Sequence, residues 1–160
     1  MATKLASIGI TMIDVGGSGG TNFAKIENLR RPEQLELFND WGIPTAASIC
    51  EVKQTQPFIS VIGTGGIRTG LDIAKAISLG CSCVGVAGLF LKALHENGEE
   101  GLEVTVNRFH DELKLVMTVL GIKKVDELRK VPLIISGETY HWLRQRGIPT
   151  KNYAQRVYPH

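Results

Sequence analysis

The 160-residue sequence lacks several features that mark large classes of protein. Its net charge is only +2, and its lysines and arginines are scattered among aspartates and glutamates, so it has no basic stripe for nucleic acid. No apolar run approaches the roughly 20 residues of a membrane span, and the N-terminus has no charged-then-apolar secretion signal. We therefore expect a cytoplasmic protein that binds neither nucleic acid nor membrane.

Cysteine and histidine are also sparse. The three cysteines, Cys50, Cys81 and Cys83, lie in apolar segments without the second pair of ligands that a zinc site needs. The four histidines show no metal-ligand spacing. We therefore expect three reduced core thiols and no metal site on this chain.

The composition, 43% hydrophobic and 21% charged, is that of one globular domain. Apolar runs predict four short strands, at residues 8–15, 43–49, 58–62 and 83–86. Helical patterns are found at residues 1–7, 33–41, 71–79 and 89–97. Short, continuously apolar strands separated by helices are typical of a parallel sheet that is buried on both faces, so we predict an α/β fold.

Two glycine-rich turns carry the strongest functional signal. Gly65 and Gly66 follow the third predicted strand, Ala87 and Gly88 follow the fourth, and each turn opens into a helix. A helix N-terminus carries unpaired N–H groups and roughly half a positive charge, and glycine lets a phosphate approach the backbone. Two such turns on consecutive units indicate the phosphate grip that (β/α)8 barrels form after their last two strands. The alternative is that the glycines only serve tight turns.

The position of these turns predicts a partial barrel. A closed (β/α)8 barrel has eight strands and about 250 residues, whereas this chain has four predicted strands with the glycine turns on the last two. We therefore expect the C-terminal half of a TIM barrel, beginning inside the helix that precedes the fifth strand.

The pattern changes after Gly98. Residues 99–120 have the apolar stripe of a long amphipathic helix, and residues 125–130 predict a shorter helix. We divide the chain into a half barrel, residues 1–98, and a C-terminal helical extension, residues 99–160, that packs on the barrel. The aromatic and basic tail of this extension is interpreted as packing on the barrel end or on a neighbouring subunit, with an RNA surface as the alternative.

Two runs of residues resemble one family. Residues 14–28, which contain Gly-Gly-Thr-Asn-Phe-Ala, and residues 65–75, which begin Gly-Gly-Ile-Arg, are similar to the type 2, FMN-dependent isopentenyl-diphosphate delta-isomerases, and so is the tail at residues 142–148. The resemblance covers essentially the whole chain. It implies a flavoprotein of isoprenoid biosynthesis that interconverts isopentenyl and dimethylallyl diphosphate, with reduced FMN as acid-base catalyst, Mg²⁺ on the diphosphate and NADPH as reductant.

The resemblance also implies which residues hold the cofactor. Thr21 would contact FMN, and backbone amides would bind the FMN phosphate at Gly65, Gly66, Ile67, Ala87 and Gly88. No catalytic residue and no metal ligand is assigned to this chain, because the family's substrate, Mg²⁺ and flavin-contacting lysine residues lie in the first half of the barrel. We therefore predict that the chain alone is inactive. We also expect a homo-oligomer, because a half barrel leaves open strand edges and apolar surface.

Four other polar residues each keep two interpretations. Arg68 either adds charge to the phosphate or is a surface residue at a helix start. Asn22 either reaches the cofactor or the substrate, or caps a turn. Glu27 either reaches the cofactor or the substrate, or pairs with Arg30 or Arg31. Asp14 orients the glycine loop by accepting N–H bonds, or acts as a catalytic acid.

Two rival functions remain. Ser48-Ile49-Cys50 has a superficial likeness to the catalytic-cysteine loop of inosine-monophosphate dehydrogenase-like barrels, although no glycines surround Cys50. The second rival is a non-catalytic remnant that binds phosphate, flavin or nothing.

Overall fold

The computed structural model describes residues 1–20, 22–33 and 36–158. In these residues one parallel sheet has the strand order β1-β2-β3, with β1 at Met12–Asp14, β2 at Ser60–Thr64 and β3 at Cys83–Gly85. Ile13 lies opposite Val61, and Gly63 lies opposite Val84. Each strand therefore pairs with its neighbour in chain order, as in consecutive units of a β/α barrel.

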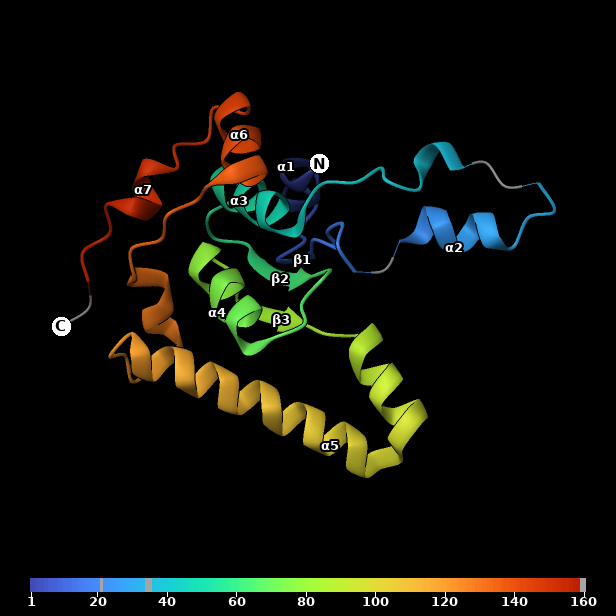
Figure 1. Ribbon diagram of the computed structural model, residues 1–160. Helices are drawn as coiled ribbons and strands as arrows, with labels where there is room; N and C mark the ends of the chain where they lie inside the picture. The colour runs from blue at the N-terminus through green and yellow to red at the C-terminus, as the bar shows by residue number, and fades with distance from the viewer. Residues whose placement is uncertain (21, 34–35, 159–160) are drawn as a thin grey trace.

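Helices surround this small sheet (Figure 1). The α-helices are α1 (Ala2–Ser7), α2 (Phe23–Leu29), α3 (Thr45–Thr55), α4 (Gly70–Leu79), α5 (Gly88–Val119), α6 (Gly137–Gln145) and α7 (Lys151–Ala154), and the 3-10 helices are η1 (Glu36–Phe38) and η2 (Val125–Lys130). α3 packs against β2 and α6, whereas α4 packs against α5 and η2. The segment with α2 and η1 extends away from the sheet (Figure 1).

The predicted strand at residues 43–49 is wrong, because residues 45–49 are the start of α3, and before them Pro44 makes only an isolated parallel bridge to Ser18. Pro44 occupies the N-cap position, where its fixed φ and missing N–H cost nothing, and two alanines follow. The helix buries Ala47, Ile49 and Cys50. A short apolar run does not by itself distinguish a strand from a buried helix, and the described residues accordingly hold three strands instead of four.

The predicted helix at residues 33–41 is also largely wrong. Residues 34 and 35 lie outside the described residues, and of the rest only η1 is helical, as a 3-10 turn. The α-helix of this region is α2, which begins after Asn22 because the Asn22 side chain accepts a hydrogen bond of 2.9 Å from the amide of Lys25. The helix-capping interpretation of Asn22 is therefore the one that the structure supports.

α4 and α5 follow the sequence patterns closely, whereas α6 and α7 were not predicted. α4 covers the predicted residues 71–79, with a capping box between Thr69 and Asp72 at its start and Gly80 in the left-handed conformation at its end. α5 bends at Gly98, where φ is 66° and ψ is −161°, so the expected break between two helical segments is confirmed. The second segment then runs back along α4 (Figure 1).

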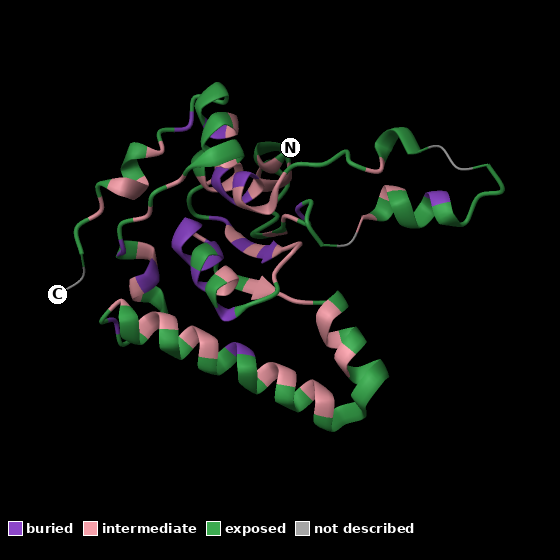
Figure 2. Cartoon of the chain, viewed as in Figure 1, coloured by how far each residue is buried: buried purple, intermediate pink, exposed green. Residues whose placement is uncertain are grey.

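The main core joins the sheet to the C-terminal tail. Val61 of β2 and Ile49 of α3 are fully buried, and Leu143 of α6 belongs to the same cluster. Buried positions are visible on β2, α3 and α4 (Figure 2). Cys50 and Cys81 are buried free thiols, as expected, but Cys83 is exposed on β3, which contradicts its expected place in the core. Cys83 is exposed to solvent because β3 is an edge strand of the described sheet.

A hydrogen-bonded contact anchors the tail to α3. The indole Nε1 of Trp142 donates to the Glu51 carboxylate at 2.7 Å, and Arg146 Nε donates to the same carboxylate at 3.1 Å. Within the described residues, every helix is either too short or too polar to traverse a lipid bilayer.

Candidate phosphate and cofactor site

The candidate site lies where the strands of the sheet end. Because β2 and β3 are parallel, with Thr64 opposite Gly85, the segments that follow them emerge at the same edge of the sheet. This arrangement brings two groups of predicted site residues to one edge: Gly65, Gly66 and Ile67 from the turn after β2, and Ala87 and Gly88 from the turn after β3. Thr21, the other predicted cofactor contact, lies outside the described residues.

The turn after β2 requires glycine for its backbone. Gly65 has a φ of 104° and Gly66 has a φ of 76°, a left-handed region that other residues rarely adopt. A β-carbon on Gly66 would lie 2.7 Å from the carbonyl oxygen of Gly19, and one on Gly65 would collide with the carbonyl of Gly17. The loop after β1 thus packs backbone to backbone on this turn, and that packing requires both glycines even without a ligand.

Carboxylate side chains accept hydrogen bonds from the backbone amides at the start of α4 and just before it. The amides of Arg68 and Thr69 donate to the Asp72 carboxylate at 3.1 Å, and the amide of Gly70 donates to Glu112 Oε2 at 2.6 Å. Glu112 reaches this amide from the second segment of α5. Two carboxylates therefore occupy the N-terminus of α4, and an anion would be repelled there.

The three backbone amides that precede Arg68 in the sequence lack such acceptors. Among the described residues, no acceptor is found for the N–H groups of Gly65, Gly66 and Ile67. Partly buried backbone donors are nearly always paired in folded proteins, with protein, water or a ligand. Three successive N–H donors that lack an acceptor among the described residues, two of them on positive-φ glycines, could serve an anion.

The turn after β3 offers a second set of donors. Ala87 is the N-cap residue of α5 and makes no side-chain capping bond. A β-carbon placed on Gly88 would meet nothing within 4 Å, so the space beside this helix start is open. The partial positive charge of a helix N-terminus is therefore accessible next to the strand that carries the first turn. The residues present fit a phosphate group.

A hydrogen-bond network ties the loop after β1 to the end of β2. The amide of Gly16 donates to Asp14 Oδ1 at 3.0 Å, and the Thr64 hydroxyl donates to the same oxygen. The amide of Gly17 donates to the carbonyl of Thr64 at 2.9 Å. Asp14 therefore orients the glycine loop by accepting hydrogen bonds, which is the first of its two predicted roles.

Two polar residues of this site were missed by the sequence analysis. Thr45 donates from its hydroxyl to the carbonyl of Gly65 at 2.7 Å, and Glu112 binds the amide of Gly70. Thr45 was missed because the sequence analysis placed it inside a strand. Glu112 was missed because it lies 42 residues after Gly70 in the sequence. The Pro-Thr pair at the start of α3 is a helix-start signal that could have located Thr45.

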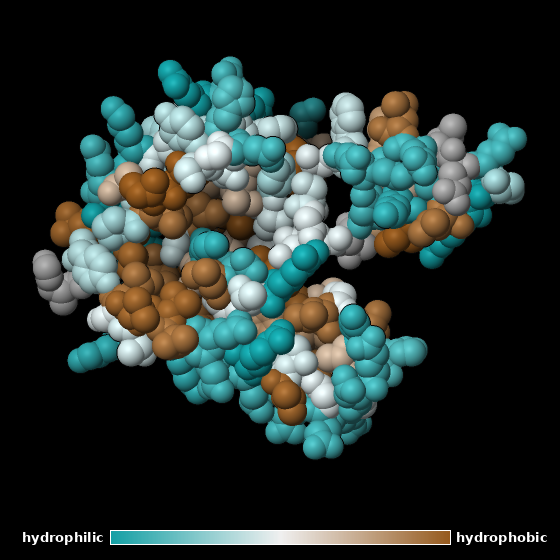
Figure 3. Space-filling view, in the orientation of Figure 1, coloured by the Kyte–Doolittle hydropathy of each residue, from teal (hydrophilic) through white to brown (hydrophobic). Residues whose placement is uncertain are grey.

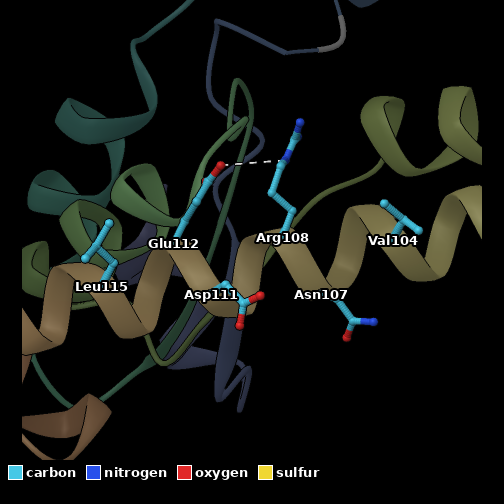
Figure 4. Close-up of a pocket in the computed structure, with 6 residues that line it drawn as sticks. All are labelled: Val104, Asn107, Arg108, Asp111, Glu112 and Leu115. Atoms are coloured by element: carbon cyan, nitrogen blue, oxygen red, sulfur yellow. Dashed lines mark ion pairs between the residues drawn. The ribbon is translucent and has the colours of Figure 1, made fainter.

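The described residues line a hollow beside the glycine loop and another along α5. One of about 350 Å³ lies between the glycine loop and the segment with α2, lined by residues such as Gly19, Asn22 and Trp41. The other, of about 520 Å³, lies along α5, where Arg108 and Glu112 point to the same side and form an ion pair at 3.6 Å (Figure 4). Glu112 is thus held between the Arg108 guanidinium and the Gly70 amide.

Neither Glu27 nor Arg68 is fixed in the site. The Glu27 carboxylate lies 3.9 Å from Arg30 and 4.0 Å from Arg31 on the exposed face of α2, as in its pairing interpretation. Arg68 is exposed at the start of α4, and among the described residues its side chain makes no hydrogen bond or ion pair.

Cys50 lacks the properties of a nucleophile. It is fully buried in α3, and burial raises the pKa of its thiol above the ordinary value. Burial likewise raises the pKa of Cys81 to about 12. A catalytic cysteine needs an accessible thiol with a lowered pKa, so the structure does not support the catalytic-cysteine interpretation.

The sequence is similar to a known family over most of its length. Residues 2–134 match the family of FMN-dependent dehydrogenases. The isopentenyl-diphosphate delta-isomerase of Geobacillus sp. (strain WCH70) is 56% identical over 155 residues, which are 97% of this chain and 44% of that protein. The same enzyme of Bacillus pumilus (strain SAFR-032) is 50% identical over 98% of this chain and 44% of its own length. The chain thus spans less than half of these curated relatives.

Solved structures show the same fold. A mandelate oxidase carrying a monooxide FMN adduct superposes with a TM-score of 0.66 at 24% identity, over 84% of this chain and 38% of the oxidase. A flavocytochrome b2 variant with bound sulfite gives a TM-score of 0.62 at 22% identity, over 88% of this chain and 36% of that one. At these identities the likeness concerns the fold alone, and it confirms the expected α/β partial barrel.

Proposed function

We propose, from the premise that the chain belongs to the FMN-dependent dehydrogenase family, that it is the flavin-phosphate-binding part of an isopentenyl-diphosphate delta-isomerase. The amides of Gly65, Gly66 and Ile67 carry this proposal, because among the described residues they have no acceptor and are therefore available to an anion. The identity of 50 to 56% to relatives with that name supports the reaction class.

In this function the turn residues bind and orient the phosphate. The amides of Gly65, Gly66 and Ile67 donate to phosphate oxygens from one side, and those of Ala87 and Gly88 donate from the start of α5. The helix N-terminus stabilises the negative charge. Thr21, which lies outside the described residues, is the further flavin contact in this proposal. When bound, reduced FMN supplies acid-base chemistry for moving a proton at an allylic carbon.

The other participants bind outside this chain. We assign the isoprenoid diphosphate substrate, Mg²⁺ and NADPH to the part of the relatives that the chain does not span, and we place the enzyme in the cytoplasm. The chain alone then anchors a cofactor but lacks the contacts that stabilise a transition state. Purified chain is expected to give no turnover of isopentenyl diphosphate with reduced FMN and Mg²⁺, and measurable turnover would contradict this assignment.

Flavin titration tests the phosphate site directly. Riboflavin has the same ring system as FMN but lacks the phosphate, so the ratio of their dissociation constants isolates the phosphate contacts. We expect the chain to bind FMN at least about tenfold more tightly than riboflavin, measured by quenching of flavin fluorescence, since charge-assisted hydrogen bonds are each worth more than about 1.4 kcal/mol. Equal affinities would exclude the proposed site.

A matched pair of variants at Gly88 sharpens the titration. A β-carbon at Gly88 would meet nothing within 4 Å, and the side chains of Gly88→Asn and Gly88→Asp have nearly the same shape, whereas only that of Gly88→Asp is negatively charged. Gly88→Asp should weaken FMN at least about fivefold relative to Gly88→Asn by repulsion of the phosphate, and riboflavin should bind both equally. If the two variants bind FMN equally, the phosphate lies elsewhere.

A further inference from the structure

Thr45, the first residue of α3, lies against the end of β2. Its Oγ1 is 2.7 Å from the carbonyl oxygen of Gly65, 3.3 Å from that of Thr64 and 3.5 Å from that of Ser18. A hydroxyl carries one proton and can donate one strong hydrogen bond. The nearest oxygen, that of Gly65, is therefore its acceptor, and the side chain joins α3 to the glycine turn.

This hydroxyl does not serve its own helix. A threonine near a helix N-terminus commonly caps that helix through its side chain. The N-cap residue of α3 is Pro44, and the helix has no side-chain capping bond. The orientation of Thr45 toward Gly65 is therefore not explained by the stability of α3.

The bond to Gly65 fixes the direction of a neighbouring amide. The carbonyl of Gly65 and the N–H of Gly66 belong to one planar trans peptide and point in opposite directions. Because both residues are glycine, side chains do not restrict rotation of this plane. Among the described residues, the Gly66 N–H has no acceptor of its own, so the Thr45 hydroxyl and the packing of the loop after β1 set its orientation.

We propose that Thr45 is a positioning residue of the phosphate site, whose hydroxyl holds the Gly65–Gly66 peptide with the Gly66 amide directed at the anion. The proposal rests on the proposed function. A donor that is already ordered binds more tightly, because its freedom is not lost on binding. Thr45 itself does not contact the phosphate.

Two substitutions at Thr45 and one control separate the hydroxyl from the shape of the side chain. Thr45→Val keeps the branched shape without the hydroxyl, and Thr45→Ser keeps the hydroxyl. The control Thr55→Val removes a hydroxyl from the other end of α3, where it donates to the backbone carbonyl oxygen of Glu51 at 3.0 Å. We expect Thr45→Val to weaken FMN about fivefold to tenfold, as for loss of one neutral hydrogen bond. Riboflavin affinity should stay unchanged in all three.

The ligand-free chain gives an independent readout. In nuclear magnetic resonance, the order parameter of the Gly66 amide should be near the rigid value of about 0.85 in the unmodified chain and fall below about 0.6 in Thr45→Val. Thr45→Ser and Thr55→Val should retain the rigid value. If Thr45→Val does not fold, Thr45→Ala, which places a smaller side chain beside Gly17, replaces it.

The flavin titrations and the order parameters distinguish failure of the role of Thr45 from failure of the phosphate site. A Gly66 amide that stays rigid in Thr45→Val, or a variant that weakens FMN and riboflavin by the same factor, would overturn the role of Thr45. Equal binding of FMN and riboflavin by the unmodified chain would instead overturn the phosphate site, and with it the role of Thr45 there, whatever the order parameters show.

Discussion

Gly65 and Gly66 meet two separate demands. Their positive φ angles and their contact with the carbonyls of Gly17 and Gly19 require glycine for reasons of backbone packing. Their free amides are a distinct property that glycine does not create. The sequence pattern predicts a glycine turn at the position where the structure has one, but the residue types alone do not separate backbone packing from anion binding. The hydrogen-bond partners of each amide do.

The buried thiol of Cys81 predicts a pH dependence. Burial raises its pKa from the ordinary 9.0 to about 12, so the folded chain keeps the proton where the unfolded chain releases it. The resulting stability is fully present below about pH 9 and is lost as the pH rises toward about 12. Urea unfolding at about pH 8 and about pH 10.5 should show this decline, and Cys81→Ala should reduce it.

Cys83 provides the control for that measurement. Cys83 is exposed on β3; burial is the largest cause of the raised Cys81 pKa, and the charge of Cys83 is a smaller cause. Cys83→Ala should therefore flatten the decline above about pH 9 less than Cys81→Ala does. If Cys83→Ala flattens the pH profile as much as Cys81→Ala does, burial is not its cause.

Among the elements, α4 and α3 show what local sequence can predict. α4 is bounded by local signals, the Thr69–Asp72 capping box and Gly80, so its limits were predicted almost to the residue. α3 carries a consecutive apolar run whose direction of burial depends on β2 and α6, which lie elsewhere in the sequence. The contact of Thr45 with Gly65 follows from that packing, and sequence periodicity could not predict it.

Glu112 predicts a dependence of α4 on α5. Its carboxylate accepts the Gly70 amide at 2.6 Å and has a half-buried position, so Glu112→Ala leaves a helix N-terminus without this acceptor. We expect a loss of about 1 to 2 kcal/mol in the free energy of unfolding, measured with urea. Glu112→Gln, which keeps an acceptor oxygen, should lose less.

Glu103 on the same helix is the matched control. It is exposed, and among the described residues its side chain makes no hydrogen bond or ion pair. Glu103→Ala should therefore change the free energy of unfolding by less than about 0.5 kcal/mol. A loss as large as that of Glu112→Ala would show that the contact with Gly70 contributes nothing particular.

The whole molecule is a partial barrel with open sides. In the described sheet, β1 and β3 each pair along one edge only. Large apolar residues are exposed on α5, including Val104, Leu115 and Val119, and apolar patches are visible on the body and on the segment with α2 (Figure 3). The expectation of a partial barrel is confirmed, although its glycine turns follow the second and third of three described strands instead of the third and fourth of four.

These open surfaces lead us to propose self-association. The chain has a mass of 17.5 kDa, and light scattering at micromolar concentration should give a larger mass that falls on dilution, because contiguous exposed apolar surface promotes association. The double substitution Leu115→Lys and Val119→Lys on α5 should shift the mass toward the monomer. Val157→Lys, at another exposed apolar residue, is the control. A monodisperse monomer of the unmodified chain would contradict the proposal.

The strand order β1-β2-β3 has a consequence for how such genes can be divided and rejoined. Every strand pairing in the described sheet links strands that are neighbours in the sequence. A break between two β/α units therefore separates only the one pair of strands at the break, and all other pairings stay within one piece. Gene fission at such a point would yield polypeptides whose internal ladders are intact and whose free edges are complementary. Recombination of barrel fragments by shuffling whole units is favoured for the same reason.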